Sequence, residues 1–430
     1  MHNAVNINGS MLKNTSFQDF LCCAKGKEVV CFGAGGWLHI AKRFLKEYDI
    51  SISFAVDNNF WKNGTFINDI PIFSPEKLKN HTSKKNVCVL ICSDAIFDIE
   101  NQLQQLDIEH YFALPLFIEE LYRKNYVINS GIPLGNQMFK EGTSVDIMIN
   151  DSCNLSCHYC KHILNKTGAV MPLEHFNNIL EQCRDLRIMG EKITRIRLDG
   201  NREALLHPNF TEILSETKKK GYSICIATNG TLLSREKAKA IAEFVDAVNI
   251  SVTGVNPETY YHFQGSNRPG AAQQLSNVKK NVSGLVEIRN QMRSKLKIHI
   301  SYILTGQSAH EVRNAVFFWL GIGVDNVRIG HNYNQYTIAL ENAKVGDIRY
   351  HKFPNGDAVC IRTSVVATSG DVYPCCLPGG EQIPIGNCLK SSLQEVFASP
   401  RYYQITSGLA SSERELLPMP CRTCGTIATV

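Results

Sequence analysis

Three cysteines lie close together in the middle of the chain, at Cys153, Cys157 and Cys160. They directly follow an apolar stretch that reads as a strand, which places the three thiols on one loop. Cysteine thiolates are the usual protein ligands of iron–sulfur clusters, and three of them leave one iron of a four-iron cluster open for another ligand. A zinc site completed by His158 or His162 is the alternative, although structural zinc sites more often use two well-separated pairs.

A second set of cysteines gathers near the C-terminal end of the sequence, where Gly370 permits a tight hairpin between two of its members. Its members are Cys360, Cys375, Cys376, Cys421 and Cys424. Four thiols in two pairs suit a fully ligated iron–sulfur cluster and equally suit a zinc ribbon. The spacing of this set does not decide between the two metals.

The sequence predicts a cytoplasmic globular protein that spans no membrane and binds no nucleic acid. Apolar residues make up 44% of the chain, no segment reaches the ~18 apolar residues of a membrane span, and no signal peptide is apparent. The net charge of +5 is too small for a nucleic-acid footprint. In a reducing compartment, 16 cysteines indicate metal ligands or buried thiols rather than disulfides. Burial in the core is expected for Cys22, Cys23, Cys31, Cys88, Cys92, Cys183 and Cys225.

Strands alternate with helices in two successive series, which predicts an α/β protein built on parallel sheets. The second series has expected strands near 144–150, 194–199, 223–228, 247–252, 297–304 and 326–330. Six such units predict a partial (β/α)6 barrel, a fold whose active site lies at the carboxyl ends of its strands. The expected organisation is an N-terminal arm over 1–26, a Rossmann-like domain with a parallel sheet over 27–124, a linker over 125–142, the barrel over 143–340 and a small Cys-rich α+β domain over 341–430.

The middle of the chain, about 143–335, resembles the radical S-adenosylmethionine (SAM) enzymes. Cys-x3-Cys-x2-Cys with Tyr159 before the last cysteine resembles their signature. The motifs that follow agree in order: 199–208 is similar to the family's Gly-Gly-Glu-Pro stretch and Leu-Leu-His-Pro, 227–231 to its Thr-Asn-Gly turn, 249–254 to its serine-bearing fourth strand and 327–330 to its sixth strand. One departure is Arg202, which stands where the family usually has glycine.

The resemblance implies that Cys153, Cys157 and Cys160 hold a [4Fe–4S] cluster whose open iron binds SAM. It also implies that Glu203 meets the methionine amino group and that Ser251 meets the ribose or carboxylate. The SAM-binding residues expected on this basis are Tyr159, Gly200, Glu203, Thr228, Asn229, Ser251 and Ile329.

The C-terminal region resembles the SPASM extension of radical SAM enzymes, through Cys-x9-Gly-x4-Cys and the segments 385–387 and 392–397. The full form has seven cysteines and two auxiliary clusters, and the later cysteines are absent from this sequence. The resemblance therefore implies the shortened twitch form with one auxiliary [4Fe–4S] cluster, held by Cys360, Cys375, Cys421 and Cys424. Cys376 is the rival of Cys375, and Cys388 is expected to serve packing.

The N-terminal domain carries an incomplete dinucleotide fingerprint, Gly33-Ala34-Gly35-Gly36, with Asp57 following the second strand. Residues 27–115 resemble the N-terminal domain of bacterial sugar acyltransferases that bind nucleotide-linked sugars, in this turn, in Asp57-Asn58 and in the Ile-Pro-Ile-x-Ser-Pro-Glu stretch. The resemblance implies a nucleotide-sugar site at Gly33, Gly35, Gly36 and Asp57. A domain of this kind that binds nothing is the alternative.

The resemblances together imply an oxidoreductase, or a related radical enzyme, that uses a 5′-deoxyadenosyl radical to oxidise or rearrange a carbohydrate or nucleotide-linked sugar. The substrate is thus a small molecule, with peptide maturation as the alternative, and the electron donor is a flavodoxin or ferredoxin. A zinc-binding interaction protein is the remote alternative from outside the enzymes.

Overall fold

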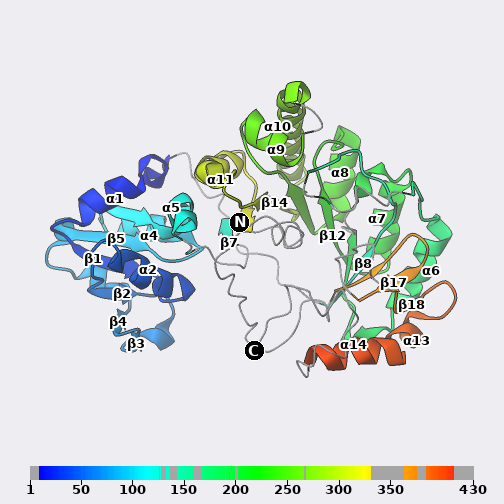
Figure 1. Cartoon of the computed structure of the whole chain (residues 1–430), viewed down its shortest axis with the longest axis horizontal. Helices are drawn as coiled ribbons and strands as arrows, with labels where there is room; N and C mark the ends of the chain where they lie inside the picture. The colour runs from blue at the N-terminus through cyan, green and yellow to red at the C-terminus, as the bar shows by residue number, and fades with distance from the viewer. Residues whose placement is uncertain are drawn as a thin grey trace. The chain divides into compact units, whose positions relative to one another are not determined.

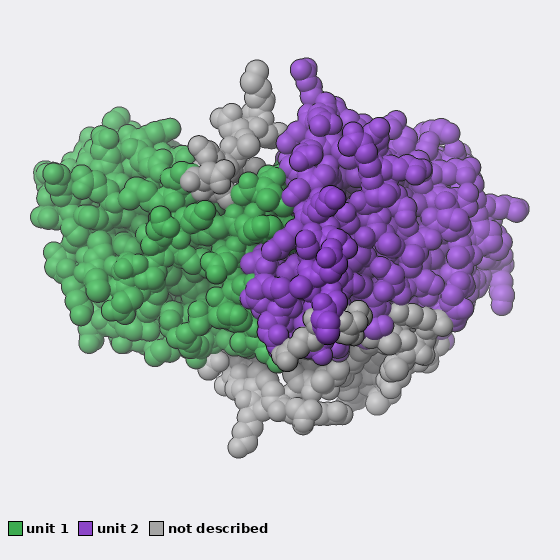
Figure 2. All heavy atoms as spheres, turned by 90° about the horizontal axis from the view of Figure 1, so that it is seen from above, with its two compact units in different colours: residues 1–138, 304–330 green, residues 139–303, 331–430 purple. Residues whose placement is uncertain are grey.

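The computed structural model describes residues 9–124, 126, 132–135, 143–158, 160, 167–188, 190–198, 202–265, 268–330, 363–374 and 384–410. The chain divides into two compact units, residues 1–138 with 304–330 and residues 139–303 with 331–430 (Figure 2). This division counts residues 304–330 with the first unit. The predicted domain limits stay predictions.

The first unit contains a six-stranded sheet in the order β3-β4-β2-β1-β5-β6 (Figure 1). All neighbours pair in parallel except β3 and β4. This is the arrangement of a doubly wound sheet, in which the strand order reverses beside β1. The strands are β1 (Glu28–Phe32), β2 (Phe54–Val56), β3 (Phe66–Ile67), β4 (Ile70–Phe73), β5 (Val87–Ile91) and β6 (Tyr111–Ala113).

Apolar runs and capped amphipathic helices build this unit. All five residues of β5 are buried, as expected for a central parallel strand. Ser16 begins α1 with a reciprocal capping box to Asp19. The helices are α1 (Phe17–Ala24), α2 (Gly36–Lys46), α3 (Glu76–Lys79), α4 (Ile96–Gln105), α5 (Ile118–Arg123) and α11 (Val312–Gly321).

Burial of the scattered cysteines is confirmed for Cys31, Cys88, Cys92 and Cys183 and is wrong for Cys22. Cys22 is exposed because Phe20 and Ala24, four residues apart, lie on the buried face of α1, and Cys22 lies on the opposite face. Two further cysteines, Cys23 and Cys225, are half-buried.

The second unit contains the barrel-like sheet, and five of the six expected barrel strands lie in it. Each pairs in parallel with the next. They are β8 (Ser144–Ile147), β11 (Arg195–Leu198), β12 (Ser223–Thr228), β13 (Ala247–Ser251) and β14 (Lys297–Ile303). The sixth expected strand, β15 (Asn326–Gly330), also forms and pairs antiparallel with β7 (Ile132–Gly135). The expected linker therefore contains a strand.

Helices follow the barrel strands as the sequence predicts. In α7, for example, Phe210, Ile213, Leu214 and Thr217 are buried at helical spacing. The helices are α6 (Leu173–Cys183), α7 (Phe210–Lys219), α8 (Arg235–Phe244), α9 (Pro257–Phe263) and α10 (Arg268–Gln291). A short hairpin, β9 (Arg187–Ile188) with β10 (Glu191–Lys192), precedes β11. No helix among the residues that the structure describes is long and apolar enough to span a membrane.

The C-terminal region continues the barrel-like sheet. The strand β16 (Thr363–Val366) pairs in parallel with β8, and β17 (Asp371–Tyr373) and β18 (Gly386–Asn387) continue the sheet as antiparallel neighbours. Two helices follow, α13 (Leu393–Phe397) and α14 (Pro400–Ala410). The C-terminal region is thus anchored on the strand that leads into the first cysteine loop.

Candidate active site

The predicted site residues of the second unit follow the carboxyl ends of neighbouring parallel strands. The cysteine loop comes after β8, Glu203 after β11, Asn229 after β12, and Ser251 ends β13. Because these strands are parallel, their carboxyl ends meet at one edge of the sheet. The fold therefore brings the cysteine loop and the polar residues to the same edge, which is where active sites of such folds lie.

The three cysteines of the loop are half-buried and form no disulfide with another described residue. The backbone N–H of Cys160 donates to the carbonyl of Cys157 over 3.0 Å, which closes a turn between the last two ligands. The Cys153 sulfur lies 3.5 Å from the backbone nitrogen of Leu155 and 3.9 Å from Nδ2 of Asn229. Iron is bound by the thiolate form of cysteine, and a thiolate can accept hydrogen bonds of this kind.

The donor set fits an iron–sulfur cluster better than a single metal ion. Among the described residues, no three His, Cys, Asp or Glu side chains converge closely enough to hold one ion. A [4Fe–4S] cluster binds each cysteine through a different iron, so its ligands need not converge on one point. His158, one of the two candidate ligands of the alternative zinc site, contacts the carbonyl oxygen of His262 through Nδ1 over 2.8 Å.

The Glu203 carboxylate lies at the centre of a buried network at the same edge of the sheet. Its side chain accepts hydrogen bonds from Oγ1 of Thr228 and the backbone N–H of Asn229, both over 2.8 Å. Glu203 is only 1% exposed. Burial raises the pKa of its carboxyl above the ordinary value, and these hydrogen bonds offset that effect only in part.

Replacing Glu203 by glutamine will make iron-free protein less sensitive to pH. An acid whose pKa is higher in the folded than in the unfolded state destabilises the fold when it ionises, so wild type loses stability as pH rises above about 4.3. The free energy of unfolding should therefore shift in favour of Glu203→Gln by about 1.4 kcal/mol per unit of pKa elevation. Denaturant titrations of both proteins from pH 4.5 to 8 measure this difference, and a constant difference would contradict it.

The other predicted SAM residues are placed less closely. Ser251 is half-buried, and its carbonyl accepts a hydrogen bond from Nε2 of Gln264 over 2.6 Å. Ile329 is buried in β15, in the first unit. Two predicted SAM residues, Tyr159 and Gly200, lie outside the described residues, as do Cys360, Cys375, Cys376, Cys421 and Cys424. Cys388 is 2% exposed, in agreement with its expected packing role.

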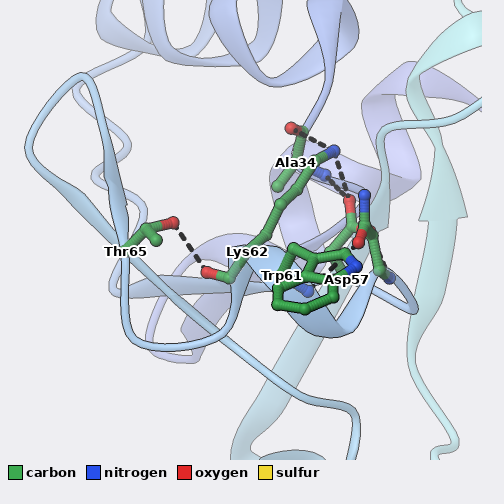
Figure 3. Close-up of polar contacts among 6 residues, drawn as sticks. Ala34, Asp57, Trp61, Lys62 and Thr65 are labelled. Carbon is green, nitrogen blue, oxygen red and sulfur yellow. Dashed lines mark hydrogen bonds and ion pairs between the residues drawn. The ribbon is translucent and has the colours of Figure 1, made fainter.

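The glycine-rich turn of the first unit contacts Asp57 through Ala34 (Figure 3). Gly33 has φ +111°, and a Cβ there would lie 2.3 Å from the carbonyl oxygen of Cys92, so only glycine fits. Asp57 Oδ2 accepts the backbone N–H of Ala34 over 2.7 Å. Burial alone would raise the pKa of Asp57, but hydrogen bonds from Asn59, Ala34 and Lys62 bring it below its ordinary value.

Lys62 contacts the glycine-rich turn, although the sequence did not identify it as a site residue. Its Nζ lies 3.1 Å from Oδ2 of Asp57 and 2.9 Å from the carbonyl oxygen of Ala34 (Figure 3). The neighbouring Trp61 is 84% exposed on the 3-10 turn η3 (Phe60–Lys62), whose N-cap is Asn59. A lysine five residues after a fingerprint aspartate was the available signal, but lysines in loops are too frequent to stand out.

Comparison with known proteins gives two family matches. Residues 147–326 match the radical SAM superfamily, and residues 360–425 match the SPASM iron–sulfur cluster-binding domain. The second match supports the SPASM class and leaves the number of auxiliary clusters as a prediction. Neither match covers the N-terminal sheet.

Three curated relatives are similar to parts of this chain. A tungsten-containing aldehyde ferredoxin oxidoreductase cofactor-modifying protein of Pyrococcus furiosus is 28% identical over 210 residues, 47% of this chain and 53% of the relative. A probable GTP 3′,8-cyclase of Methanothermobacter thermautotrophicus is 31% identical over 170 residues, 39% and 51%. A PqqA peptide cyclase of Streptomyces rochei is 21% identical over 316 residues, 65% and 80%. The chain thus spans about half the length of the first two.

Proposed function

We propose that this chain, which is a radical SAM enzyme with a C-terminal SPASM iron–sulfur region, oxidises or rearranges a carbohydrate or a nucleotide-linked sugar. Its cofactors are SAM, the SAM-binding [4Fe–4S] cluster and auxiliary iron–sulfur chemistry of the SPASM region. The enzyme assignment replaces the alternative of a zinc-binding interaction protein. The substrate class and the residue roles below are proposals.

Cys153, Cys157 and Cys160 would hold the SAM-binding cluster at the edge of the barrel-like sheet. When bound and reduced, that cluster supplies the electron that cleaves SAM to methionine and a 5′-deoxyadenosyl radical. The Glu203 carboxylate would mainly position other residues of the chain and not bind SAM directly, because its oxygens already accept hydrogen bonds from Thr228 and Asn229. It would hold the backbone of Asn229 beside the loop, where the side-chain amide of Asn229 donates to Oδ1 of Asn154 over 2.9 Å.

The remaining SAM-binding roles follow the resemblance and need residues from several strands. Tyr159 would lie beside the adenine, and Gly200 and Ser251 would contact the methionine and ribose parts of SAM. Ile329 would pack near the adenine. The reducing electron would come from a flavodoxin or ferredoxin. Oxidation of the substrate would pass an electron to one auxiliary cluster held by Cys360, Cys375, Cys421 and Cys424.

The sugar substrate rests on one observation, the glycine-rich turn at the carboxyl end of β1. Doubly wound sheets bind nucleotides at this position, where the strand order reverses. The turn is followed by α2, and Asp57 and Lys62 both bond the backbone of Ala34 within it. The name of one relative, a probable GTP 3′,8-cyclase, agrees with a nucleotide-bearing substrate.

Peptide maturation is the second candidate, because the PqqA peptide cyclase matches 80% of its own length against this chain. The two candidates differ in what should stimulate turnover. Anaerobic enzyme with SAM, a reductant and either nucleotide sugars or candidate precursor peptides would be assayed for 5′-deoxyadenosine. Transfer of deuterium from one substrate class into 5′-deoxyadenosine identifies the class that the enzyme acts on.

Replacing Gly35 by leucine will weaken nucleotide-sugar binding by at least about tenfold and leave SAM cleavage unchanged. Gly35 has an ordinary extended backbone, and no atom lies within 4 Å of a Cβ built on it, so leucine will fit the fold and obstruct the turn. Calorimetry with a panel of nucleotide sugars measures the binding.

The matched control is Gly33→Ala, which must clash with Cys92 and should unfold the domain rather than weaken binding selectively. If wild type binds no nucleotide sugar, the N-terminal domain is only structural and the sugar proposal loses its support.

A further inference from the structure

Arg202 and Asp151 form an ion pair that joins the entrance of the cysteine loop to the segment after β11. Nε of Arg202 lies 2.5 Å from Oδ1 of Asp151, and the side chains are only 9% and 10% exposed. Arg202 is the residue at which this sequence departs from the motif that it resembles. We propose that Arg202 is a positioning residue, which fixes the cysteine loop in its SAM-binding shape before cluster and SAM are bound.

Asp151 closes the two ends of the loop onto each other. Its Oδ2 accepts the backbone N–H of Thr167 over 2.8 Å and the Thr167 hydroxyl over 2.7 Å. Its own N–H donates to the carbonyl of Ala169 over 2.8 Å. One carboxylate therefore ties the residue that enters the loop to the residues that leave it, and its other oxygen is held by Arg202.

The backbone beside Arg202 continues the same connection toward the cysteines. The Glu203 N–H donates to the carbonyl of Ser152 over 3.0 Å, and the Asn150 amide donates to the carbonyl of Glu203 over 2.9 Å. The Glu203 carboxylate in turn holds Asn229, whose amide reaches the Cys153 sulfur. A displacement of residues 202–203 would therefore move the side-chain amide of Asn229, which donates to the Cys153 sulfur.

Glycine at position 202 could not form this ion pair. Glycine has the greatest backbone freedom of any residue and would leave Asp151 without its cationic partner in a nearly buried place. Removing one member of a buried ion pair is costly, because the remaining charge keeps its desolvation penalty. Residues that orient metal ligands typically change metal affinity or activity by about 10–100-fold when they are replaced.

The test compares Arg202→Gly and Arg202→Lys with wild type, in the full chain and under anaerobic conditions. Arg202→Gly should bind SAM about tenfold more weakly and retain less iron and sulfide after reconstitution. Its KM for SAM should rise more than its kcat falls. Lysine keeps the charge without the planar fork of arginine and should restore SAM affinity in part. Hydrogen exchange of iron-free protein should show faster exchange in residues 151–158 of Arg202→Gly.

Arg197→Gln is a matched control for general loss of stability. Arg197 and Asp146 pair over 2.9 Å between the same two strands, β11 and β8, but before the strands reach their carboxyl ends. This variant should lower the melting temperature and keep the SAM affinity and iron content of wild type. Like Arg202→Gly, this variant removes the arginine of an ion pair, but the pair lies within the strands and not beside the cysteine loop.

Two results would overturn the proposal. One is wild-type SAM affinity and exchange rates in Arg202→Gly, and the other is equal loss of SAM affinity in Arg197→Gln. If Arg202→Gly does not fold, Arg202→Lys and Asp151→Asn decide. Both must then weaken SAM binding in folded protein, and wild-type affinity in the two variants would refute the positioning role.

Discussion

A variant with alanine at Cys153, Cys157 and Cys160 will keep about four irons, against about eight in wild type, and will lose SAM cleavage completely. The three thiols share one loop at the carboxyl edge of the barrel-like sheet. Without them the reducing electron has no route to SAM. Iron and sulfide per chain and the yield of 5′-deoxyadenosine with dithionite measure the two effects.

Cys183→Ala is the control for loss of a thiol as such. Cys183 is fully buried in α6, and burial raises the pKa of its thiol to about 12, so it is protonated and unavailable to iron at neutral pH. Its alanine variant should retain the irons and the SAM cleavage of wild type. Zinc without sulfide in reconstituted wild type would contradict the cluster assignment itself.

Much of the positioning of this site follows from local sequence patterns. The alternation of apolar strands and amphipathic helices predicts β8, β11, β12, β13 and β14, and parallel pairing then puts their carboxyl ends at one edge. The parallel sheet of the first unit follows in the same way. These features depend on hydrophobic periodicity, which a single sequence displays. They also depend on the right-handed β/α connections that nearly all such folds share.

Contacts between distant segments could not be predicted. Asp151 and Arg202 are 51 residues apart, and each is an ordinary loop residue in the sequence. The strand β16 pairs with β8 although the other barrel strands lie between the two in the sequence. The sequence of a short strand does not identify the strand with which it pairs. For the same reason the grouping of β15 with the N-terminal unit and the approach of Lys62 to Asp57 emerge only from the structure.

The separate roles of the two metal centres lead to the second large effect. Replacing Cys424 by alanine should leave SAM cleavage to 5′-deoxyadenosine and block formation of product. Four cysteines can ligate the auxiliary cluster fully, and a closed cluster suits electron transfer rather than substrate binding. The substrate radical would still form and would then fail to lose its electron. Deuterium from labelled substrate should therefore still appear in 5′-deoxyadenosine.

Cys388→Ala separates ligand loss from local damage in the same region. Cys388 is 2% exposed beside β18, and burial raises the pKa of its thiol to about 11, which marks it as a packing residue. Its variant should make product, whereas Cys421→Ala should behave like Cys424→Ala. Since ligand loss can also remove folding free energy, all three variants must first show the melting behaviour of folded protein. Product formation at the wild-type rate by folded Cys424→Ala would make the auxiliary centre structural, because the substrate radical would then be losing its electron elsewhere or not at all.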